Sequence, residues 1–337
     1  MENKPSARGN EAAAEKQRDI QREQDRKDAA KAKAKEQGMA SKQEQQSGSP
    51  KTGRPQPEEL PAQHLEKPGL EADMELKPRF FAPDYRGSGK LKGMVALITA
   101  GDSGIGRWVV VLYPPDSAHV AIVYLSSHED AEETKRWVEK EGRQCLLIPG
   151  DVKDSKFCKE AVEKTVAQFD RLDILVNNAA FQEHADSLAD ISDERLEETM
   201  KTNIFGYFYM ARAALQHLKP GASIINTGSV VGLRGSANLL DYSATKGAIH
   251  AFTMSLASSV LEKGIRVNCV APGPVWTPLN PADQTAEKVA EFGKSSDMKR
   301  PAQPEELSPA YVFLASPACA SYITGIVLPV TGSVGAT

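Results

Sequence analysis

The sequence predicts an α/β fold, a doubly wound sheet of seven parallel strands with helices on both faces. Three observations indicate it. From residue 91 onward, short apolar runs alternate with segments of helical periodicity, as in successive β-α-β units. The first of these runs leads straight into a glycine-rich turn and a helix. At 337 residues with 40% apolar side chains, the chain can also bury one large core and still carry an appendage.

The first ninety residues form that appendage, in two parts. Residues 1–53 are rich in Ala, Lys, Glu and Gln, with too little apolar surface to offset the entropy lost on ordering, so we expect a charged low-complexity tail, disordered or partly helical. A solvated single helix is one form it could take, and a nucleic-acid-binding arm is disfavoured because acids nearly balance bases. Residues 54–90 are proline-rich and predict an extended arm over the folded domain or a neighbouring subunit. Residues 91–337 form the domain.

Composition limits the possible classes of function. The net charge of −4 gives no sign of a nucleic-acid partner. The four cysteines are scattered, without the paired spacing of a metal site or a disulfide framework, so no metal is expected. The chain opens without the apolar core of a signal peptide and has no uninterrupted apolar stretch long enough to span a bilayer. The expectation is a cytoplasmic protein with no membrane partner.

Seven short apolar runs, bounded by turn residues, are expected to be the strands. They cover residues 95–99, 120–125, 145–149, 174–177, 223–227, 266–270 and 326–330. Between the second and third strands, Ser126 and Glu129 form a capping-box pattern that predicts a helix over 126–141. A longer helix is expected over 193–218, with Asn203 inside it. Asn is a poor residue for a helix interior, so it either costs stability or does polar work.

The turn after the first strand carries the first chemical signal. Gly101, Gly104 and Gly106 let the backbone approach a diphosphate closely. The helix that begins near Ile105 directs free amides and its positive dipole end at the same anion. This pattern is typical of a Rossmann-like dinucleotide site, although a glycine turn after a strand is about as often only a tight turn.

A second signal lies on a later helix, where Tyr242 and Lys246 are four residues apart and so share one face. A nearby cation favours phenolate, so Lys246 is expected to lower the pKa of Tyr242 from about 10 and make it an acid–base group. Ser229 follows the strand at 223–227, which delivers its hydroxyl to the carboxyl edge of the sheet. Alone, the pair would be a chance match on an amphipathic helix.

In order and spacing, these motifs resemble the short-chain dehydrogenase/reductase family over residues 91–332. The shared motifs are the glycine turn, Asp151-Val152, Asn177-Asn178-Ala179-Ala180, Asn203, Ser229, Tyr242 with Lys246, and Pro272-Gly273 followed by Thr277. More closely, the turn and residues 240–249 are similar to a subgroup of bacterial general stress oxidoreductases and plant glucose/ribitol dehydrogenase homologues. The resemblance implies an oxidoreductase that interconverts a small aldehyde, ketone or sugar and its alcohol with NAD or NADP.

The resemblance also implies a role for each matching residue. Tyr242 would be the general acid/base, Ser229 would hold the substrate oxygen, Lys246 would bond the nicotinamide ribose, and Asn203 would hold a water that links Lys246 to solvent. The implied cofactor contacts are Thr99, Gly104, Ile105, Gly106, Asp151, Val152, Asn178, Ala179, Tyr242, Lys246, Pro272, Gly273 and Thr277. Family members assemble as homotetramers, for which Tyr207, Phe208, Met210 and Phe252 are the exposed candidates here.

The choice between NAD and NADP depends on the end of the second strand. Tyr124 stands where an acidic residue would bind the ribose 2′-hydroxyl, so a strict preference for NAD lacks its usual cause. Arg107 is a candidate partner for a 2′-phosphate, and the balance slightly favours NADP. Outside the motifs, His184 is expected to be a solvated loop residue, with orientation of a polar substrate as the alternative. Trp276 is expected to be hydrophobic cover, with a platform for a sugar ring as the alternative.

Several residues depart from the family pattern. Ala100 occupies the first glycine position of the turn, which would cost on the order of 1 kcal/mol if that position needs positive φ. Trp108 needs room, and the prolines at 114–115 should end the first helix early. Two alternatives therefore stay open: a cofactor-binding scaffold or stress protein with little turnover, and a protein whose amino-terminal tail carries the main role.

Overall fold

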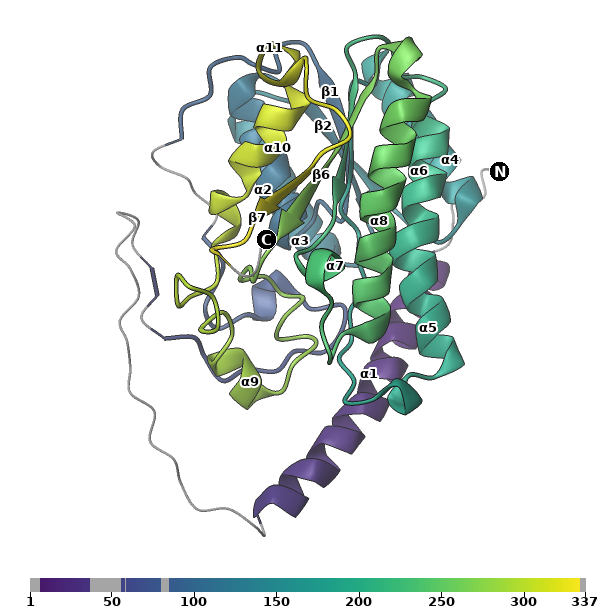
Figure 1. Ribbon diagram of the computed structural model, residues 1–337. Coiled ribbons are helices and arrows are strands. Elements are labelled where there is room, and N and C mark those ends of the chain that lie inside the picture. The colour runs from purple at the N-terminus through teal and green to yellow at the C-terminus, as the bar shows by residue number, and fades with distance from the viewer. Residues whose placement is uncertain (1–6, 37–55, 58, 80–84, 334–337) are drawn as a thin grey trace.

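The computed structural model describes residues 7–36, 56–57, 59–79 and 85–333. Its centre is an all-parallel sheet of seven strands in the order β3-β2-β1-β4-β5-β6-β7 (Figure 1). The strands are β1 (Val95–Thr99), β2 (His119–Tyr124), β3 (Cys145–Pro149), β4 (Ile174–Asn177), β5 (Ser223–Thr227), β6 (Arg266–Pro272) and β7 (Val327–Val330). The predicted fold class is confirmed. The strand order reverses between β1 and β4, the position where ligands bind in doubly wound sheets.

Helices cover both faces of the sheet and divide the core in two. On one face lie α2 (Gly104–Leu112), α3 (His128–Lys140) and α10 (Ser308–Ala315), with α11 (Pro317–Ala320) beside α10. On the other face lie α4 (Ser155–Phe169), α6 (Gly206–Ala214) and α8 (Leu240–Ser259). Because both faces are covered, every residue of β1 is buried, which explains why the strands are continuous apolar runs. The short elements are α7 (Val231–Arg234), α9 (Ala286–Ala290), η2 (Pro114–Asp116), η3 (Leu188–Asp190), η5 (Leu261–Lys263) and η6 (Pro304–Glu306).

Two predicted helices have different bounds in the structure. α3 begins at His128, because the chain turns at Ser126, whose carbonyl accepts the His128 amide at 2.9 Å. Ser127 is the N-cap and makes no side-chain cap bond, so the predicted capping box is wrong. The helix expected over 193–218 is instead α5 (Asp193–Met200), the π-helical turn η4 (Lys201–Phe205) and α6. Asn203 therefore lies in a π-helical turn, a local widening that is often found at functional sites.

The unusual first helix fits within the core. Trp108 is fully buried, and α2 ends at Leu112, just before the two prolines, as predicted. The early end is at the carboxyl end of α2, away from the glycine turn. The early end of α2 therefore leaves the glycine turn in place. This weakens the alternative of a scaffold whose cofactor site is damaged.

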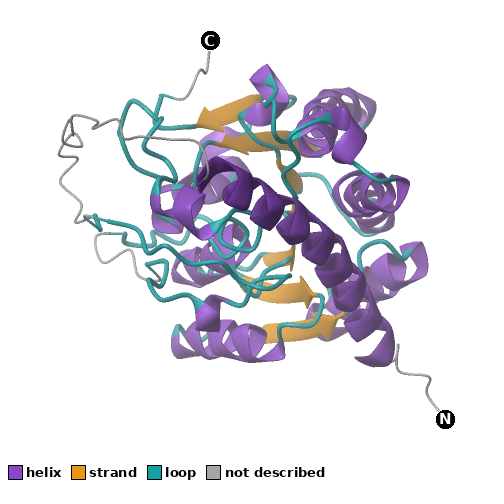
Figure 2. Ribbon diagram, turned by 90° about the horizontal axis from the view of Figure 1, so that it is seen from below, coloured by secondary structure: helices purple, strands orange, loops and turns teal. Residues whose placement is uncertain are grey.

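The amino-terminal segment packs on the domain. α1 (Ala7–Glu36) crosses below the carboxyl edge of the sheet (Figures 1 and 2) and buries Ala14, Gln17, Gln21 and Gln24, which share one helix face. A solvated single helix, one form that the sequence left open, is therefore wrong for residues 9–30, whereas the predictions for residues 1–6 and 37–53 lie outside the described residues. In the described part of the arm, the only helix is η1 (Glu71–Asp73), and the Leu65 amide donates to the Pro281 carbonyl of the domain at 2.8 Å. Of the helices described, none is long and apolar enough to cross a bilayer.

Candidate active site

A pocket of about 400 Å³ opens at the carboxyl edge of the sheet, where the strand order reverses. The predicted site residues in its wall are Gly104, Ile105, Asp151, Val152, Asn178, Ala179, Ser229, Tyr242, Lys246, Pro272, Gly273 and Thr277. One continuous pocket therefore joins the glycine turn to the Tyr242/Lys246 pair. In a doubly wound sheet, a pocket at this position is where a dinucleotide is expected to bind.

Three predicted residues lie behind the pocket wall instead of in it. Thr99 is buried, and its Oγ1 accepts the amides of Asn178 and Ala179 at 2.8 and 3.0 Å, which fixes the end of β4 against β1. Gly106 allows a close backbone contact, because an added Cβ would lie 1.8 Å from the Ala100 carbonyl oxygen. Thr99 and Gly106 thus support the turn from behind the pocket wall, and their contact with the cofactor stays a prediction. The third residue is Asn203, described below.

The first position of the turn is strained. Ala100 has φ 49°, in the left-handed region, so the predicted cost on the order of 1 kcal/mol applies. Its carbonyl accepts the side-chain amide of Asn178 at 3.3 Å, which helps to hold this backbone conformation. The turn therefore keeps the shape that glycine would allow, at some cost in stability.

Tyr242, Lys246 and Ser229 come together at one wall of the pocket. Tyr242 and Lys246 lie on α8 and are buried, and Ser229 follows β5. Ser229 and Tyr242 both line the pocket, and the Ser229 hydroxyl lowers the pKa of the Tyr242 phenol. The Lys246 ammonium donates to the Thr227 carbonyl at 2.8 Å and lies 5.3 Å from the centroid of the Tyr242 ring, over the ring face. The spacing of these residues in the sequence thus predicted a real cluster.

Burial controls the ionisation of this cluster. It lowers the pKa of the Lys246 ammonium to about 8. It also raises the pKa of the Tyr242 phenol above its ordinary value; the Asp283 carboxylate raises that pKa further, and the Ser229 hydroxyl lowers it. The expectation that the pKa of Tyr242 falls below about 10 is therefore wrong for this structure, because desolvation of the phenolate dominates the overall shift.

Asn203 makes polar contacts, which is one of the two possibilities that its place inside a predicted helix left open. Its side chain accepts the Phe181 amide at 2.7 Å, donates to the Phe181 carbonyl at 2.9 Å and donates to Thr245 Oγ1 at 3.0 Å. It therefore ties the loop after β4 to α8, one residue before Lys246. The water relay implied by the family resemblance stays a prediction.

His250 on α8 is a neighbour of Ser229 that the sequence did not single out. Its Nε2 accepts the Ser229 amide at 3.5 Å, and burial lowers its pKa to about 4, so the imidazole is neutral. Gly228 is needed beside it, because a Cβ there would lie 2.4 Å from His250 Nε2. This histidine bonds the backbone of Ser229, so its place supports the end of β5.

Arg107 does not face the pocket. Its side chain is fully buried, and its guanidinium pairs with Glu71 at 3.2 Å, Asp130 at 3.1 Å and Glu133 at 3.3 Å. The proposed contact between Arg107 and a 2′-phosphate is therefore wrong, because three carboxylates already bind this cation. The sequence offered no sign of the pairing with Glu71, which comes from the arm, 36 residues earlier.

Sequence reasoning also missed pocket residues from the amino-terminal segment, namely Gln17 on α1 with Pro68 and Gly69 of the arm. The arm and the loop after β6 share a small apolar cluster of Leu65, Met74, Trp276, Ala282 and Val289. Trp276 is fully buried there and donates its indole N–H to the Leu76 carbonyl at 2.9 Å. The expectation that Trp276 is hydrophobic cover is confirmed, and a platform for a sugar ring is excluded by its burial.

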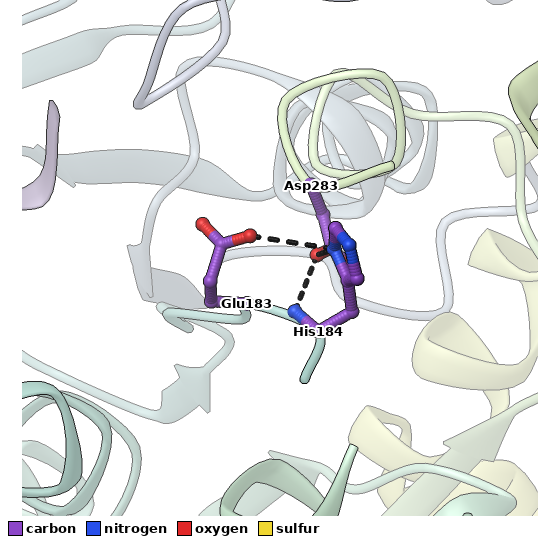
Figure 3. Close-up of side chains that lie close together, drawn as sticks. All are labelled: Glu183, His184 and Asp283. Carbon is purple, nitrogen blue, oxygen red and sulfur yellow. Dashed lines mark hydrogen bonds and ion pairs between the residues drawn. The ribbon is translucent and has the colours of Figure 1, made fainter. Parts of the chain in front are cut away.

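A buried charged cluster lies between the loop after β4 and the loop after β6 (Figure 3). His184 Nδ1 lies 3.0 Å from Asp283 Oδ1 and 3.4 Å from Glu183 Oε1, and its Nε2 lies 2.8 Å from Asp28 Oδ2 on α1. Burial opposes a charged imidazole, but the hydrogen bonds to Asp283 and Glu183 outweigh burial and raise the pKa of His184 to about 10. His184 is thus not a solvated loop residue.

The donor atoms of Glu183, His184 and Asp283 lie within 4.8 Å of one another, a spacing that a divalent cation could use. Two cations already face these carboxylates, however: the protonated His184 and the Lys67 ammonium, 3.1 Å from Glu183 Oε2. A metal ion would have to displace the His184 proton and approach Lys67. We therefore describe the cluster as an ion-paired network that joins the arm and α1 to the pocket loops.

Comparisons with known proteins agree with this geometry. The family model described as enoyl-(acyl carrier protein) reductase matches residues 99–334. General stress protein 39 of Bacillus subtilis is 54% identical over 277 residues, 82% of this chain and 96% of that protein. The chloroplastic NADPH-dependent aldehyde reductase 1 of Arabidopsis thaliana is 49% identical over 276 residues, 80% of this chain and 96% of that protein.

A solved structure gives the same result. The short-chain dehydrogenase of Burkholderia cenocepacia in complex with NADP is 31% identical, with a TM-score of 0.69 over 73% of this chain and all of that one. The likeness in fold agrees with the fold class that the sequence predicts. The chain belongs to the short-chain dehydrogenase/reductase family and is an NAD(P)-dependent oxidoreductase.

Proposed function

We propose that the protein interconverts a small aldehyde, ketone or sugar and the corresponding alcohol, with Tyr242 as general acid/base. The supporting observation is the single pocket that joins the glycine turn to Ser229, Tyr242 and Lys246. The name of the Arabidopsis relative, an NADPH-dependent aldehyde reductase, supports the substrate class. The intact turn and the buried Trp108 favour an active enzyme over a scaffold with little turnover.

Each residue of the cluster has a part in this chemistry. A bound nicotinamide supplies hydride to the carbonyl carbon, or accepts it from the alcohol. In the reducing direction, Tyr242 gives its proton to the carbonyl oxygen, and Ser229 donates a hydrogen bond to the same oxygen as negative charge develops. Lys246, charged below a pH of about 8, stabilises the phenolate that remains and bonds the nicotinamide ribose. Asn203 keeps the loop after β4 in contact with α8 and holds the water of the proposed proton relay.

We propose that both NAD and NADP are accepted. Tyr124, at the end of β2, has no carboxylate that would repel a 2′-phosphate. Arg107, on which the expected preference for NADP depended, is paired with Glu71 and Asp130. Neither cofactor therefore gains a strong charge-based advantage. We expect kcat/KM for the two cofactors to differ by less than about tenfold, which corresponds to about 1.4 kcal/mol.

A substrate panel tests the function and the cofactor choice together. Aldehydes, ketones, sugars and polyols are incubated with each cofactor, and turnover is followed by the absorbance of the reduced nicotinamide. Binding of both cofactors is measured separately by thermal shift. Turnover of a carbonyl compound with both cofactors is expected. Binding without turnover across the panel would favour the scaffold, and a cofactor ratio far above tenfold would contradict the proposed dual use.

We also propose that the protein is a homotetramer. Phe205, Phe208 and Met254 are more than two-fifths exposed on the outer side of η4, α6 and α8, and Phe208 stacks on Phe252 at 4.0 Å between ring centroids. Such an exposed apolar stripe is typical of a subunit interface. Tyr207 and Met210, two other candidates, are buried in the subunit's own core.

The variant Phe208→Glu tests this assembly. A charge at the centre of the exposed stripe is expected to convert tetramers into smaller species, because the carboxylate loses its water on association. Light scattering after size-exclusion chromatography measures the mass of both proteins, and Leu188→Glu, at a separate exposed position, serves as the control. A monomeric wild-type protein, or a Phe208→Glu variant of unchanged mass, would contradict the proposal.

A further inference from the structure

Residues 65–71 of the arm run between the two lips of the cofactor pocket. One lip is the glycine turn with the start of α2, and the other is the loop after β6. Between them, Pro68 and Gly69 form part of the pocket wall. Gly69 is pressed against the second lip with φ +85°, and a Cβ there would lie 2.8 Å from the Pro278 carbonyl oxygen. We call residues 65–71 the clasp.

Glu71 fixes the clasp to the first lip. Its Oε2 accepts the Gly104 amide at 2.9 Å, at the start of α2, where Ser103 makes no side-chain cap bond. Its Oε1 pairs with Arg107 at 3.2 Å, and its own amide donates to Asp130 Oδ2 at 2.9 Å. Glu71 is fully buried, so these contacts are shielded from water. A carboxylate from the arm therefore caps the helix that begins at the dinucleotide turn.

Lys67 fixes the clasp to the second lip and to the loop after β4. Its ammonium donates to the carbonyls of Gln182 and Ala282, each at 2.8 Å, and pairs with Glu183 at 3.1 Å. The Leu65 amide donates to the Pro281 carbonyl at 2.8 Å. Through Glu183, Lys67 joins the ion-paired network shown in Figure 3, which also holds Asp283 of this lip. The Lys67 ammonium is buried and has three oxygen partners. Separating it from them would leave a buried charge without a partner, so we expect the attachment to be strong.

We propose that the clasp closes over the cofactor, with Lys67 and Glu71 as positioning residues, and that it must open for the dinucleotide to enter or leave. The clasp therefore sets the rate of cofactor dissociation. This inference rests on the nicotinamide cofactor of the proposed function and adds to it a segment from outside the catalytic domain. α1 supports the clasp from behind, since Gln21 bonds the Lys67 amide at 2.8 Å and the Leu65 carbonyl at 2.8 Å.

The experiment measures cofactor release directly, without substrate. Wild-type protein loaded with NADPH or NADH is mixed with excess oxidised cofactor, and the fluorescence of the reduced nicotinamide reports the dissociation rate. Lys67→Ala and Glu71→Ala are each expected to raise that rate by about tenfold or more, since each removes charged hydrogen bonds that hold one lip. The Kd should rise by a similar factor, with kcat at saturating cofactor retained, because neither residue touches the reacting atoms.

A matched control lies on the same arm. Glu75 is exposed and lies outside the clasp, so Glu75→Ala should release cofactor at the wild-type rate. A folded Lys67→Ala or Glu71→Ala variant with an unchanged dissociation rate would overturn the proposal. A wild-type protein that binds neither cofactor would instead reject the proposed function.

A second measurement uses the wild-type protein alone, in case the variants fail to fold. Amide hydrogen exchange of residues 65–71 is compared with and without saturating cofactor. Slower exchange with cofactor bound, alongside unchanged exchange in α4 on the far part of the domain, is the expected result. Equal exchange of the clasp in both states would show that it does not close over the ligand, and the proposal would fail.

Discussion

Tyr242→Phe is expected to lower kcat by about 10²–10⁴-fold, the usual range for loss of a positioned general acid. The phenol lines the pocket together with Ser229, and phenylalanine keeps the ring beneath the Lys246 ammonium while removing the only proton that the ring can give. Affinity for the cofactor should change little. Turnover of an aldehyde at saturating cofactor and a separate cofactor titration measure the two effects. Full turnover by this variant would reject the mechanism.

The pH dependence of the wild-type enzyme gives an independent check. Lys246 is charged below its pKa of about 8 and neutral above it. If its charge supports the phenolate that forms during reduction, kcat/KM for reduction should be highest below that pH and fall as the pH rises through it. The raised pKa of Tyr242 keeps the phenol protonated over the same range, so the phenol does not cause the fall. The range from pH 7 to 9 covers about one pH unit on either side of this pKa. A kcat/KM that stays constant over that range would exclude this role for Lys246.

Arg107→Gln is expected to have the largest effect on stability, a loss of about 3–5 kcal/mol in the free energy of unfolding. The substitution leaves Glu71 and Asp130, both buried, without their cation. Burial already raises the pKa of Glu71 to about 7, with Arg107 opposing that rise. Without Arg107 the charged form of Glu71 becomes costlier still. Urea unfolding monitored by circular dichroism measures the loss.

The sign of the pH effect distinguishes this cause from a simple loss of packing. A carboxyl group whose pKa is raised on folding binds protons more tightly in the folded state, so the variant should regain stability as the pH falls from above 7 towards the ordinary pKa of Glu, about 4.5. Arg171→Gln is the matched control, because Arg171 is half exposed and pairs with Asp173 near the surface, a pair worth at most about 1 kcal/mol. Equal losses in the two variants would contradict the prediction.

The strands and the reactive cluster could be predicted because their signals are local. Strands of a sheet with helices on both faces are largely apolar, and the runs at 95–99, 145–149, 174–177 and 223–227 matched the structure at both ends. The spacing between Tyr242 and Lys246 fixes their shared helix face in any fold. The glycine turn could also be predicted, because glycine is the residue that most readily takes a positive φ. The positive φ considered for Ala100 is present in the structure.

The docking of α1 could not be predicted, for a different reason. Apolar periodicity reveals a buried helix face, but the buried face of α1 is made of glutamines whose amides bond the arm and the domain, such as Gln17 to Glu198 and Gln21 to Leu65 and Ala282. On its own, that face has the composition of a solvated tail. Only the partner groups, presented by distant parts of the chain, make its burial favourable.

The sequence by itself determined the sheet, the glycine turn and the identity of the residues at the reactive end of the pocket, since each depends on residues that are neighbours along the chain or along one helix. Tertiary structure decided the charges: it buried Tyr242 and so raised its pKa, bound Arg107 with Glu71 of the arm, and surrounded His184 with carboxylates from α1 and the loop after β6. The energy of a charge depends on its distance from other charges and from water, and folding sets both distances.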